Sequence, residues 1–276
     1  MLRTTFLLAT LAGIAAAQGS GPAAWQNDLT PITAADWNYD LAAQLLERAG
    51  FSGTPEEITA LSKLTPKQAV ARLVRFQGTD ASRLPAFEDS GAWDPGLEPF
   101  PPSRPAVTDH AKEFGEALGI KVKPGGNRRL QPVVDKFFYW LRASALETNR
   151  VSYWWANRMV ASPQPLREKM ALFWHGHFAV NEAKVRDYRK LLQQLELFQK
   201  QGTGNFRQLM VAVAQDPAML EFLDAAVNVK GAANENFARE IMELFTMGVG
   251  NYSEKDIREA PRLHRLEFRK PDVRRQ

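Results

Sequence analysis

Two histidines, His175 and His177, are the residues of this chain best suited to bind a metal ion. They lie in the sequence Trp174-His175-Gly176-His177-Phe178. Neutral imidazoles are good ligands for zinc, copper, nickel and iron. On a helix, however, side chains two residues apart point about 200° away from each other, so the two rings converge only if Gly176 interrupts the helix. The alternative is a pair of hydrogen-bonded histidines beside aromatic rings at a helix end.

A second set of polar side chains follows one face of a helix that we expect to begin at Asn234, a residue suited to the N-cap position. Asn236, Glu240 and Glu243 form a stripe at helical spacing. Two carboxylates one turn apart can bind a divalent metal or act as general acid and base. Glu240 and Glu243 are therefore candidate catalytic residues.

The same helix also has a purely structural interpretation. Glu235, Arg239 and Glu243 recur every four residues, which predicts a ladder of salt bridges on the solvent side. The opposite side is an apolar arc that would pack into a core; it consists of Phe237, Ala238, Ile241, Met242, Leu244 and Phe245.

The loop before this helix offers further oxygen ligands, Asp224 and Asn228. Their spacing lacks the alternating acids of a calcium-binding loop, and polar loop side chains commonly bond backbone amides instead. The chain has no phosphate-binding loop, dinucleotide glycine motif or nucleophile elbow. The one cofactor that these residues suggest is a divalent metal, with His175, His177 and Asp224 as its candidate ligands.

Helical periodicity dominates from Ala34 onward, and alternating strand patterns are almost absent, so we expect an all-α fold of many helices. Threonine followed by proline marks two helix starts, at Thr54 and Thr65. The longer helical tracts are predicted at 34–49, 132–161, 166–178, 182–200, 205–214 and 216–225.

Proline and glycine divide the chain into regions. We expect an N-terminal helical region at 34–77, a linker or surface excursion rich in proline and glycine at 78–131, and a helical domain at 132–260.

The N-terminus predicts export. Arg3 precedes the apolar run Phe6–Ile14, and Ala15–Ala17 supplies a small-residue cleavage site, as in a secretory signal peptide. We expect a signal peptide at 1–17, a flexible mature N-terminus at 18–33, and a periplasmic or extracellular protein. The apolar run is too short to span a bilayer, and the absence of cysteine excludes disulfides and thiolate chemistry.

The basic character of the chain does not indicate nucleic-acid binding. The sequence pI is about 9.3, but the last fifteen residues hold six basic against two acidic side chains, which equals the net charge of +4. A nucleic-acid interface would place its basic residues on one folded face.

Several motifs together resemble a bacterial family known as domain of unknown function 1800. They are Leu45–Pro55, Lys169–Phe178, Asp216–Met219, Asn234–Asn236, Arg239-Glu240 and Gly250–Ile257, and the resemblance extends from about Asn38 to Ala260. It implies an exported, mostly helical protein without an established activity. Relatives are often encoded beside a second exported family, which suggests another exported protein as a partner.

The resemblance stops after Ala260, where the family continues with arginine, a small or apolar pair and Thr-Gly-Trp. Pro261–Phe268 departs from that pattern. The allowed codons for this stretch include CCG CGC CTT CAC CGG CTG GAG TTT, and a shift of one base in that string reads Arg-Ala-Phe-Thr-Gly-Trp-Ser. We therefore expect residues 261–276 to be an out-of-frame tail and the chain to be an N-terminal fragment of a longer protein, with exposed apolar surface as a consequence.

Two hypotheses on function follow. The protein is either a metal-dependent, hydrolase-like enzyme with its site near the His-x-His and Asn-Glu-Asn motifs, or a surface binding or assembly module in which these residues only cap and bridge helices.

Overall fold

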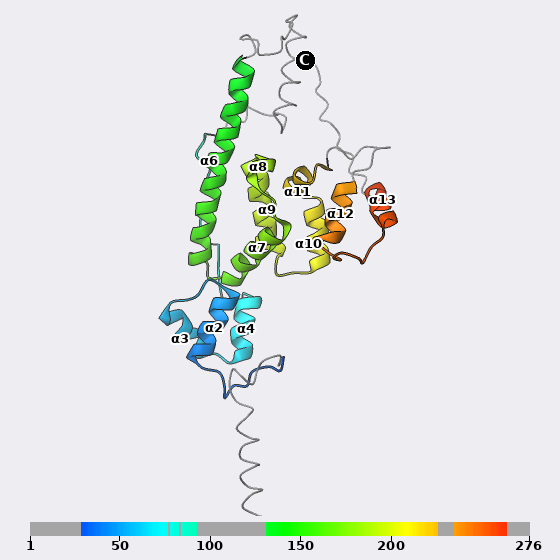
Figure 1. Cartoon of the computed structure of the whole chain (residues 1–276). Helices are drawn as coiled ribbons and strands as arrows, with labels where there is room; N and C mark the ends of the chain where they lie inside the picture. The colour runs from blue at the N-terminus through cyan, green and yellow to red at the C-terminus, as the bar shows by residue number, and fades with distance from the viewer. Residues whose placement is uncertain (1–28, 77, 83, 93–130, 226–234, 264–276) are drawn as a thin grey trace, which may run out of the picture. The chain divides into compact units, whose positions relative to one another are not determined.

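A computed structural model describes residues 29–76, 78–82, 84–92, 131–225 and 235–263 (Figure 1). Every regular element in these ranges is an α-helix, which confirms the expected all-α class. None of the helices in the described ranges is both long and apolar enough to cross a membrane. The expected signal peptide, the residues Asn228 and Asn234, and most of the expected out-of-frame tail lie outside the described residues.

Contacts divide the chain into two compact units, Met1–Thr79 and Asp80–Gln276. The first unit contains α2 (Tyr39–Ala49), α3 (Pro55–Ser62) and α4 (Pro66–Val74). Its small core is made of aliphatic side chains contributed by all three helices, namely Ala42, Leu46, Ile58, Leu61, Ala69 and Leu73.

Capping side chains set the starts of these helices. Thr54 accepts a hydrogen bond from the backbone N–H of Glu57 at 3.2 Å, and the Glu57 carboxylate accepts one from the Thr54 N–H at 2.8 Å. This reciprocal capping box satisfies two N–H groups that a helix end leaves unpaired. The helix expected at 34–49 begins at Tyr39 instead of Ala34, because Asn38 takes the N-cap position and accepts from Leu41 at 3.0 Å.

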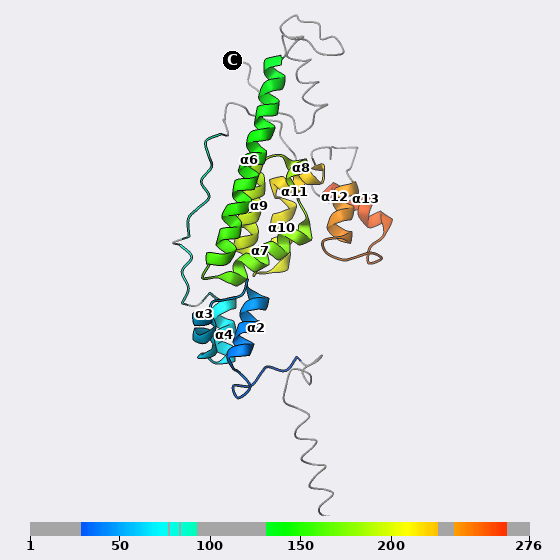
Figure 2. The ribbon, with the colours of Figure 1, turned by 60° about the vertical axis from the view of Figure 1, so that its left-hand side comes forward.

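The second unit is built around a long helix, α6 (Gln131–Ala161), with α7 and α9 packed beside it (Figure 2). Its remaining helices follow in chain order: α7 (Pro165–Phe178), α8 (Glu182–Val185), α9 (Tyr188–Gln201), α10 (Phe206–Ala214), α11 (Pro217–Phe222), α12 (Glu235–Glu243) and α13 (Glu254–Leu263).

The single helix expected at 182–200 is wrong, since the chain forms two helices there. Arg186 ends α8 in the left-handed conformation, with φ of 53°, and its N–H bonds the carbonyl of Glu182 at 2.8 Å. Asp187 then caps α9 by accepting from the N–H of Arg189 at 3.1 Å. A residue with a Cβ seldom adopts that conformation, so the helical pattern gave no sign of the break.

The core of the second unit is rich in aromatic and aliphatic side chains from α7 to α11. Phe178 and Phe198 stack at its centre, with ring centroids 5.6 Å apart. Other side chains with almost no exposed surface in this core are Val185, Leu209, Val213 and Met219.

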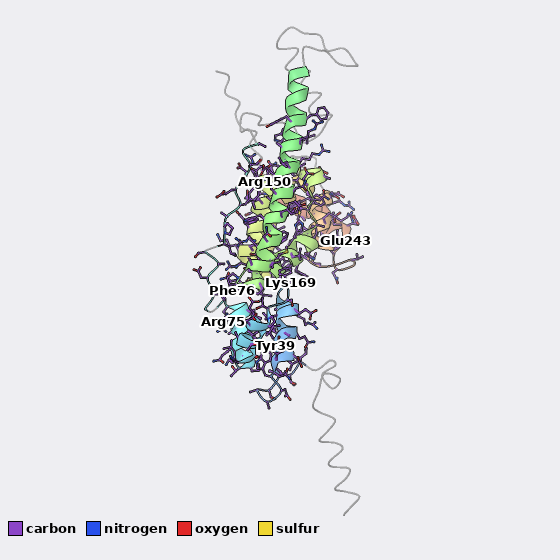
Figure 3. The ribbon with its side chains drawn as sticks, turned by 90° about the vertical axis from the view of Figure 1, so that its left-hand side faces the viewer. Tyr39, Arg75, Phe76, Arg150, Lys169 and Glu243 are labelled. Carbon is purple, nitrogen blue, oxygen red and sulfur yellow. The ribbon has the colours of Figure 1, made fainter. Side chains whose placement is uncertain are left out.

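Residues 84–92, which lie within the expected linker or excursion, run along α6 as an extended segment. We call them the strap. Trp154 donates from Nε1 to the carbonyl of Pro85 at 2.9 Å, and Arg150, labelled on α6 in Figure 3, donates to the carbonyl of Glu88 at 2.8 Å. The strap is therefore part of the folded unit.

Candidate functional site

The two histidines lie on an unbroken helix and do not converge. Helix α7 continues through Gly176 and ends at Phe178. The ring of His175 meets the edge of the Trp155 ring, with centroids 5.6 Å apart. The ring of His177 points instead toward the chain after α12, where its Nε2 lies 3.3 Å from the carbonyl oxygen of Phe245. The interruption that would bring the rings together is absent from α7.

His177 is held by a hydrogen bond and by aromatic neighbours. A carbonyl oxygen only accepts hydrogen bonds, so Nε2 must carry the proton in this contact and cannot ligate a metal at the same time. The ring also stacks on Phe173, at 6.2 Å between centroids, and meets Phe245 at 5.9 Å. The two contacts with Phe245 attach the chain that follows α12 to α7.

His175 lies in a less polar environment than a solvent-exposed histidine. Burial lowers its pKa below the ordinary value of 6.5, because desolvation disfavours the charged form of an imidazole. We expect the ring to be neutral at pH 7, packed against the indole of Trp155.

The carboxylate of Asp224 forms an ion pair with Lys184, whose Nζ lies 2.7 Å from Oδ2. Both side chains are exposed to solvent, so this pair contributes less than about 1 kcal/mol to stability. Asp224 itself has a left-handed backbone, with φ of 54°, a conformation that aspartate tolerates better than most residues. Asn228, the other candidate ligand of this loop, lies outside the described residues.

The salt bridges predicted between Arg239 and the glutamates of its own helix, α12, are wrong. Arg239 forms a fork with Glu254 of α13, with Nη1 and Nη2 each 3.1 Å from a carboxylate oxygen. A bidentate contact of this kind is stronger than a single bond to a glutamate one turn away. The hydrogen bond to Glu254 raises the pKa of Arg239 and lowers that of Glu254.

Glu243, labelled in Figure 3, accepts a hydrogen bond from the hydroxyl of Tyr252. This bond favours the neutral phenol and raises the pKa of Tyr252. Glu240 is half-buried and Asn236 is exposed. Glu243 therefore joins α12 to the segment before α13. Figures 1 and 2 both show α12 and α13 side by side.

No group of three or more histidine, aspartate or glutamate side chains able to hold a metal occurs within residues 29–92, 131–225 and 235–263, leaving aside the gaps at 77 and 83. The candidate ligands His175, His177 and Asp224 contact three different neighbours instead.

The polar centre that sequence reasoning missed is Glu168 on α7. Its carboxylate is completely buried and accepts from Trp155 Nε1 at 3.0 Å, Gln199 Nε2 at 2.7 Å and Arg158 Nε at 3.3 Å. These donors come from α6 and α9, so one carboxylate joins three helices. One feature of the sequence could have indicated this role. Glu168 is an acidic residue three positions before the buried Ala171, so helical spacing places it on the buried face of α7.

A second buried group joins α9 to α11. Asp216 accepts from Gln194 Nε2 at 2.7 Å and from the N–H of Met219 at 2.9 Å, so it caps α11 and contacts α9 at once. Burial raises the pKa of Asp216, and the two hydrogen bonds oppose that rise.

Fold and contacts thus define an all-α protein whose polar side chains connect its helices. The chain belongs to the family described as "Protein of unknown function (DUF1800)", whose model matches residues 44–263. Comparisons with curated proteins and with solved structures find no match.

Proposed function

We propose that this chain is an exported binding or assembly module and not a metal-dependent hydrolase. The proposal rests on one observation: the candidate site residues already contact other parts of the protein. Arg239 pairs with Glu254, Asp224 pairs with Lys184, and His177 bonds a backbone carbonyl. An active site needs several polar groups that converge on one reacting atom. Here each group is directed to a different helix junction.

Apolar side chains near His177 support a contact with another protein. Phe173 stacks on the His177 ring and is 56% exposed, and Leu244, beside the Phe245 that meets the same ring, is 60% exposed. Both exposed side chains lie next to residues of the α7–Phe245 contact, and exposed apolar groups of this kind are available to a partner protein. The partner that fits an exported chain is another exported protein.

Metal analysis tests the choice between module and enzyme. We expect the purified full chain to contain no stoichiometric zinc, iron, copper, nickel or manganese and to show no activity on a panel of hydrolase substrates. His177→Ala should reduce stability because the contact with Phe245 is lost, while His175→Ala serves as the neighbouring control. A stoichiometric metal that disappears in a folded His177→Ala protein would overturn the proposal in favour of the enzyme.

Export rests on the N-terminal pattern of Arg3, the apolar run and Ala15–Ala17. We expect the mature protein to begin after about Ala17 or Gly19. Expression of the complete chain in a bacterial host, followed by cell fractionation and N-terminal sequencing, tests this. Recovery of uncleaved chain from the cytoplasm alone contradicts it.

We also propose that the reading frame changes near Pro261, so that the chain is the N-terminal part of a longer family member. The support is that one allowed set of codons for Pro261–Phe268, shifted by one base, restores Arg-Ala-Phe-Thr-Gly-Trp-Ser. Resequencing the locus is decisive. An uninterrupted frame without a missing or additional base refutes the frame change and leaves the proposed module unaffected.

A further inference from the structure

Four side chains of α6 hold the backbone of the strap by hydrogen bonds. Three of them donate to carbonyl oxygens of the strap, and the fourth accepts from a strap N–H. In the order of the helix, the pairs are Tyr139 with Ala92, Glu147 with Ser90, Arg150 with Glu88, and Trp154 with Pro85. The order on the strap is the reverse of the order on α6, so the strap runs antiparallel to the helix.

These contacts would hold an extended chain of almost any sequence, because every residue except proline offers the same C=O and N–H groups. Between the strap and the described helices, no hydrogen bond joins backbone to backbone. The strap is therefore held by side chains, as a bound peptide is. In known peptide-binding sites, hydrogen bonds to the backbone of an extended ligand supply affinity, and pockets for a few side chains supply specificity.

The strap also places one side chain in a pocket. Phe87 is half-buried and packs against the core of the second unit, where it contacts the rings of Trp154 and Tyr188. Two residues further along the strap, Asp89 accepts a hydrogen bond from the Tyr188 hydroxyl at 3.3 Å. The site therefore favours an aromatic residue followed, two positions later, by an acid.

A buried carboxylate lies beneath the next residue of the strap. Glu147 has no exposed surface, and its Oε1 accepts from both the N–H and the hydroxyl of Ser90. Its other oxygen, Oε2, pairs with Arg150 at 3.3 Å. A carboxylate in such a position needs donors, so a chain that replaces the strap has to supply an equivalent N–H and hydroxyl. This selects serine directly after the acid.

The strap can leave the helices without disturbing the core. Residues 85, 86 and 88–91 are exposed, and Phe87 is the strap residue that packs against the core. A segment with so few buried apolar contacts opens at a much smaller cost in free energy than the whole unit does.

We propose that the face of α6 and α9 under the strap is a binding site for an extended peptide, which the chain fills with its own strap. The ligand is a segment of another protein that has an aromatic residue, an acid and a serine at the spacing of Phe87, Asp89 and Ser90. The contacts extend from Tyr139 to Trp154, about 22 Å along α6. Seven or eight residues of extended chain cover this length at about 3.3 Å each. The strap inhibits the site until such a segment displaces it.

A different protein fits this role better than a second copy of the chain. The strap of a second copy offers the same contacts, whereas the chain's own strap has the high effective concentration of a tethered ligand. Exchange of straps therefore gains no affinity, while a segment with stronger contacts at the same positions can displace the strap. This inference rests on the proposed binding module, because it names the chemistry of one partner. If it fails, the surface near His177 and the metal analysis still decide the proposed function.

Peptide binding to strap variants tests the site. The probe is a fluorescent synthetic peptide with the sequence of residues 84–92, added to the full chain. Phe87→Ala removes the aromatic anchor of the chain's own strap, and Ser90→Pro removes the N–H that bonds Glu147. We expect each variant to bind the probe at least tenfold more tightly than the unmodified chain does. Glu88→Ala keeps the strap contacts and should bind as weakly as the unmodified chain.

A matched pair of tyrosine variants locates the probe. In the Phe87→Ala chain, Tyr139→Phe removes one donor to the peptide backbone and should weaken binding about two- to tenfold, as expected for the loss of one hydrogen bond. Tyr153→Phe alters an exposed tyrosine of the same helix and should leave binding unchanged. A probe with alanine in place of its phenylalanine should bind none of these chains. Circular dichroism verifies that every variant keeps its helix content.

Three results would overturn the proposal. The first is that neither folded strap variant binds the probe. The second is equal affinity of the unmodified chain and Phe87→Ala, or equal effects of Tyr139→Phe and Tyr153→Phe, because the peptide then binds elsewhere. The third is a dimer of the unmodified chain in sedimentation that the probe dissociates, which would identify the strap of a second copy as the ligand.

Discussion

The buried carboxylate of Glu168 accepts a hydrogen bond from the indole of Trp155, whose Nε1 is 3.0 Å from Oε2. Gln199 donates to the same oxygen at 2.7 Å, and Arg158 pairs with the other oxygen at 3.3 Å. Because the charge is fully buried and paired with Arg158, removal of either partner leaves unsatisfied groups in the core. Glu168 is therefore a polar side chain on which the stability of the second unit should depend strongly.

We predict that Glu168→Ala lowers the free energy of unfolding of the second unit by about 3–5 kcal/mol. The donors of Trp155, Arg158 and Gln199 would lose their acceptor, and a cavity would remain. Glu168→Gln keeps one acceptor oxygen and should cost less. Urea unfolding followed by circular dichroism and tryptophan fluorescence measures both effects.

Glu196→Ala is the control for this prediction, since Glu196 is an exposed glutamate on α9. A surface substitution of this kind changes stability by less than about 0.5 kcal/mol. Equal unfolding curves for Glu168→Ala and Glu196→Ala would show that the buried contacts of Glu168 do not stabilise the fold.

Local signals in the sequence predicted much of the fold but not its buried polar contacts. Thr54 with Glu57 is a capping box within four residues, so the helix start follows directly from the local sequence. Glu168 has partners 13 and 31 residues away, at Trp155 and Gln199. Helical spacing shows which face a side chain occupies, but not which helix packs against that face.

For the candidate site, the sequence predicted two alternative arrangements of the histidines and could not choose between them. On a continuous helix, the side chains of His175 and His177 point in different directions. Glycine occurs both within helices and at breaks in them, so the sequence around Gly176 could not show whether the helix continues there. Arg239 illustrates the same limit. A local pattern offered glutamates on its own helix, whereas the folded chain brought Glu254 close enough for a bidentate contact.

Two glycines of the second unit should respond in opposite directions to alanine. Gly202 follows α9, and a Cβ there would lie 2.5 Å from the carbonyl oxygen of Phe198 and 2.8 Å from Cδ1 of Trp174. The Trp174 indole also donates to the Gly202 carbonyl at 2.7 Å, so it cannot move away freely. We predict that Gly202→Ala lowers the free energy of unfolding by about 1–3 kcal/mol.

Gly176 is the matched control, because it lies inside α7 and an added Cβ meets no atom within 4 Å. Alanine favours a helix over glycine by about 0.8–1.0 kcal/mol. Gly176→Ala should therefore raise the thermal midpoint while Gly202→Ala lowers it. Thermal unfolding by circular dichroism compares the two, and a destabilised Gly176→Ala protein would contradict the continuous helix on which the separation of His175 and His177 depends.

The strap should detach when its aromatic anchor is removed. Phe87 meets the edge of the Trp154 ring at 5.9 Å and contacts the Tyr188 ring at 6.2 Å. We predict that Phe87→Ala makes cleavage within residues 84–92 several-fold faster under limited digestion with the broadly specific proteinase K, because local opening of the strap costs less free energy.

Glu88→Ala supplies the control, since Arg150 bonds the backbone carbonyl of Glu88 and not its side chain. That bond survives the substitution, so the cleavage rate should match that of the unmodified chain. Mass spectrometry of the first fragments identifies the cut. Equal rates for Phe87→Ala and Glu88→Ala would show that the aromatic contacts do not hold the strap.

Tyr188 should make the stability of the second unit depend on pH in alkaline solution. Its side chain is buried, and burial, with a smaller contribution from Asp89, raises its pKa from 10.0 to about 12. The hydroxyl donates to Oδ2 of Asp89 at 3.3 Å. The folded chain therefore holds the phenolic proton more tightly than the unfolded chain does, which stabilises the fold below pH 10.

This stabilisation is lost as the pH rises from about 10 to about 12. We predict a decline in the urea midpoint over that range that is clearly smaller in Tyr188→Phe, which has no proton to release. Asp89→Asn removes only the nearby charge and should keep most of the decline, because burial is the larger cause of the raised pKa. If the unmodified chain and Tyr188→Phe decline equally between pH 10 and 12, ionisation of Tyr188 is not linked to unfolding.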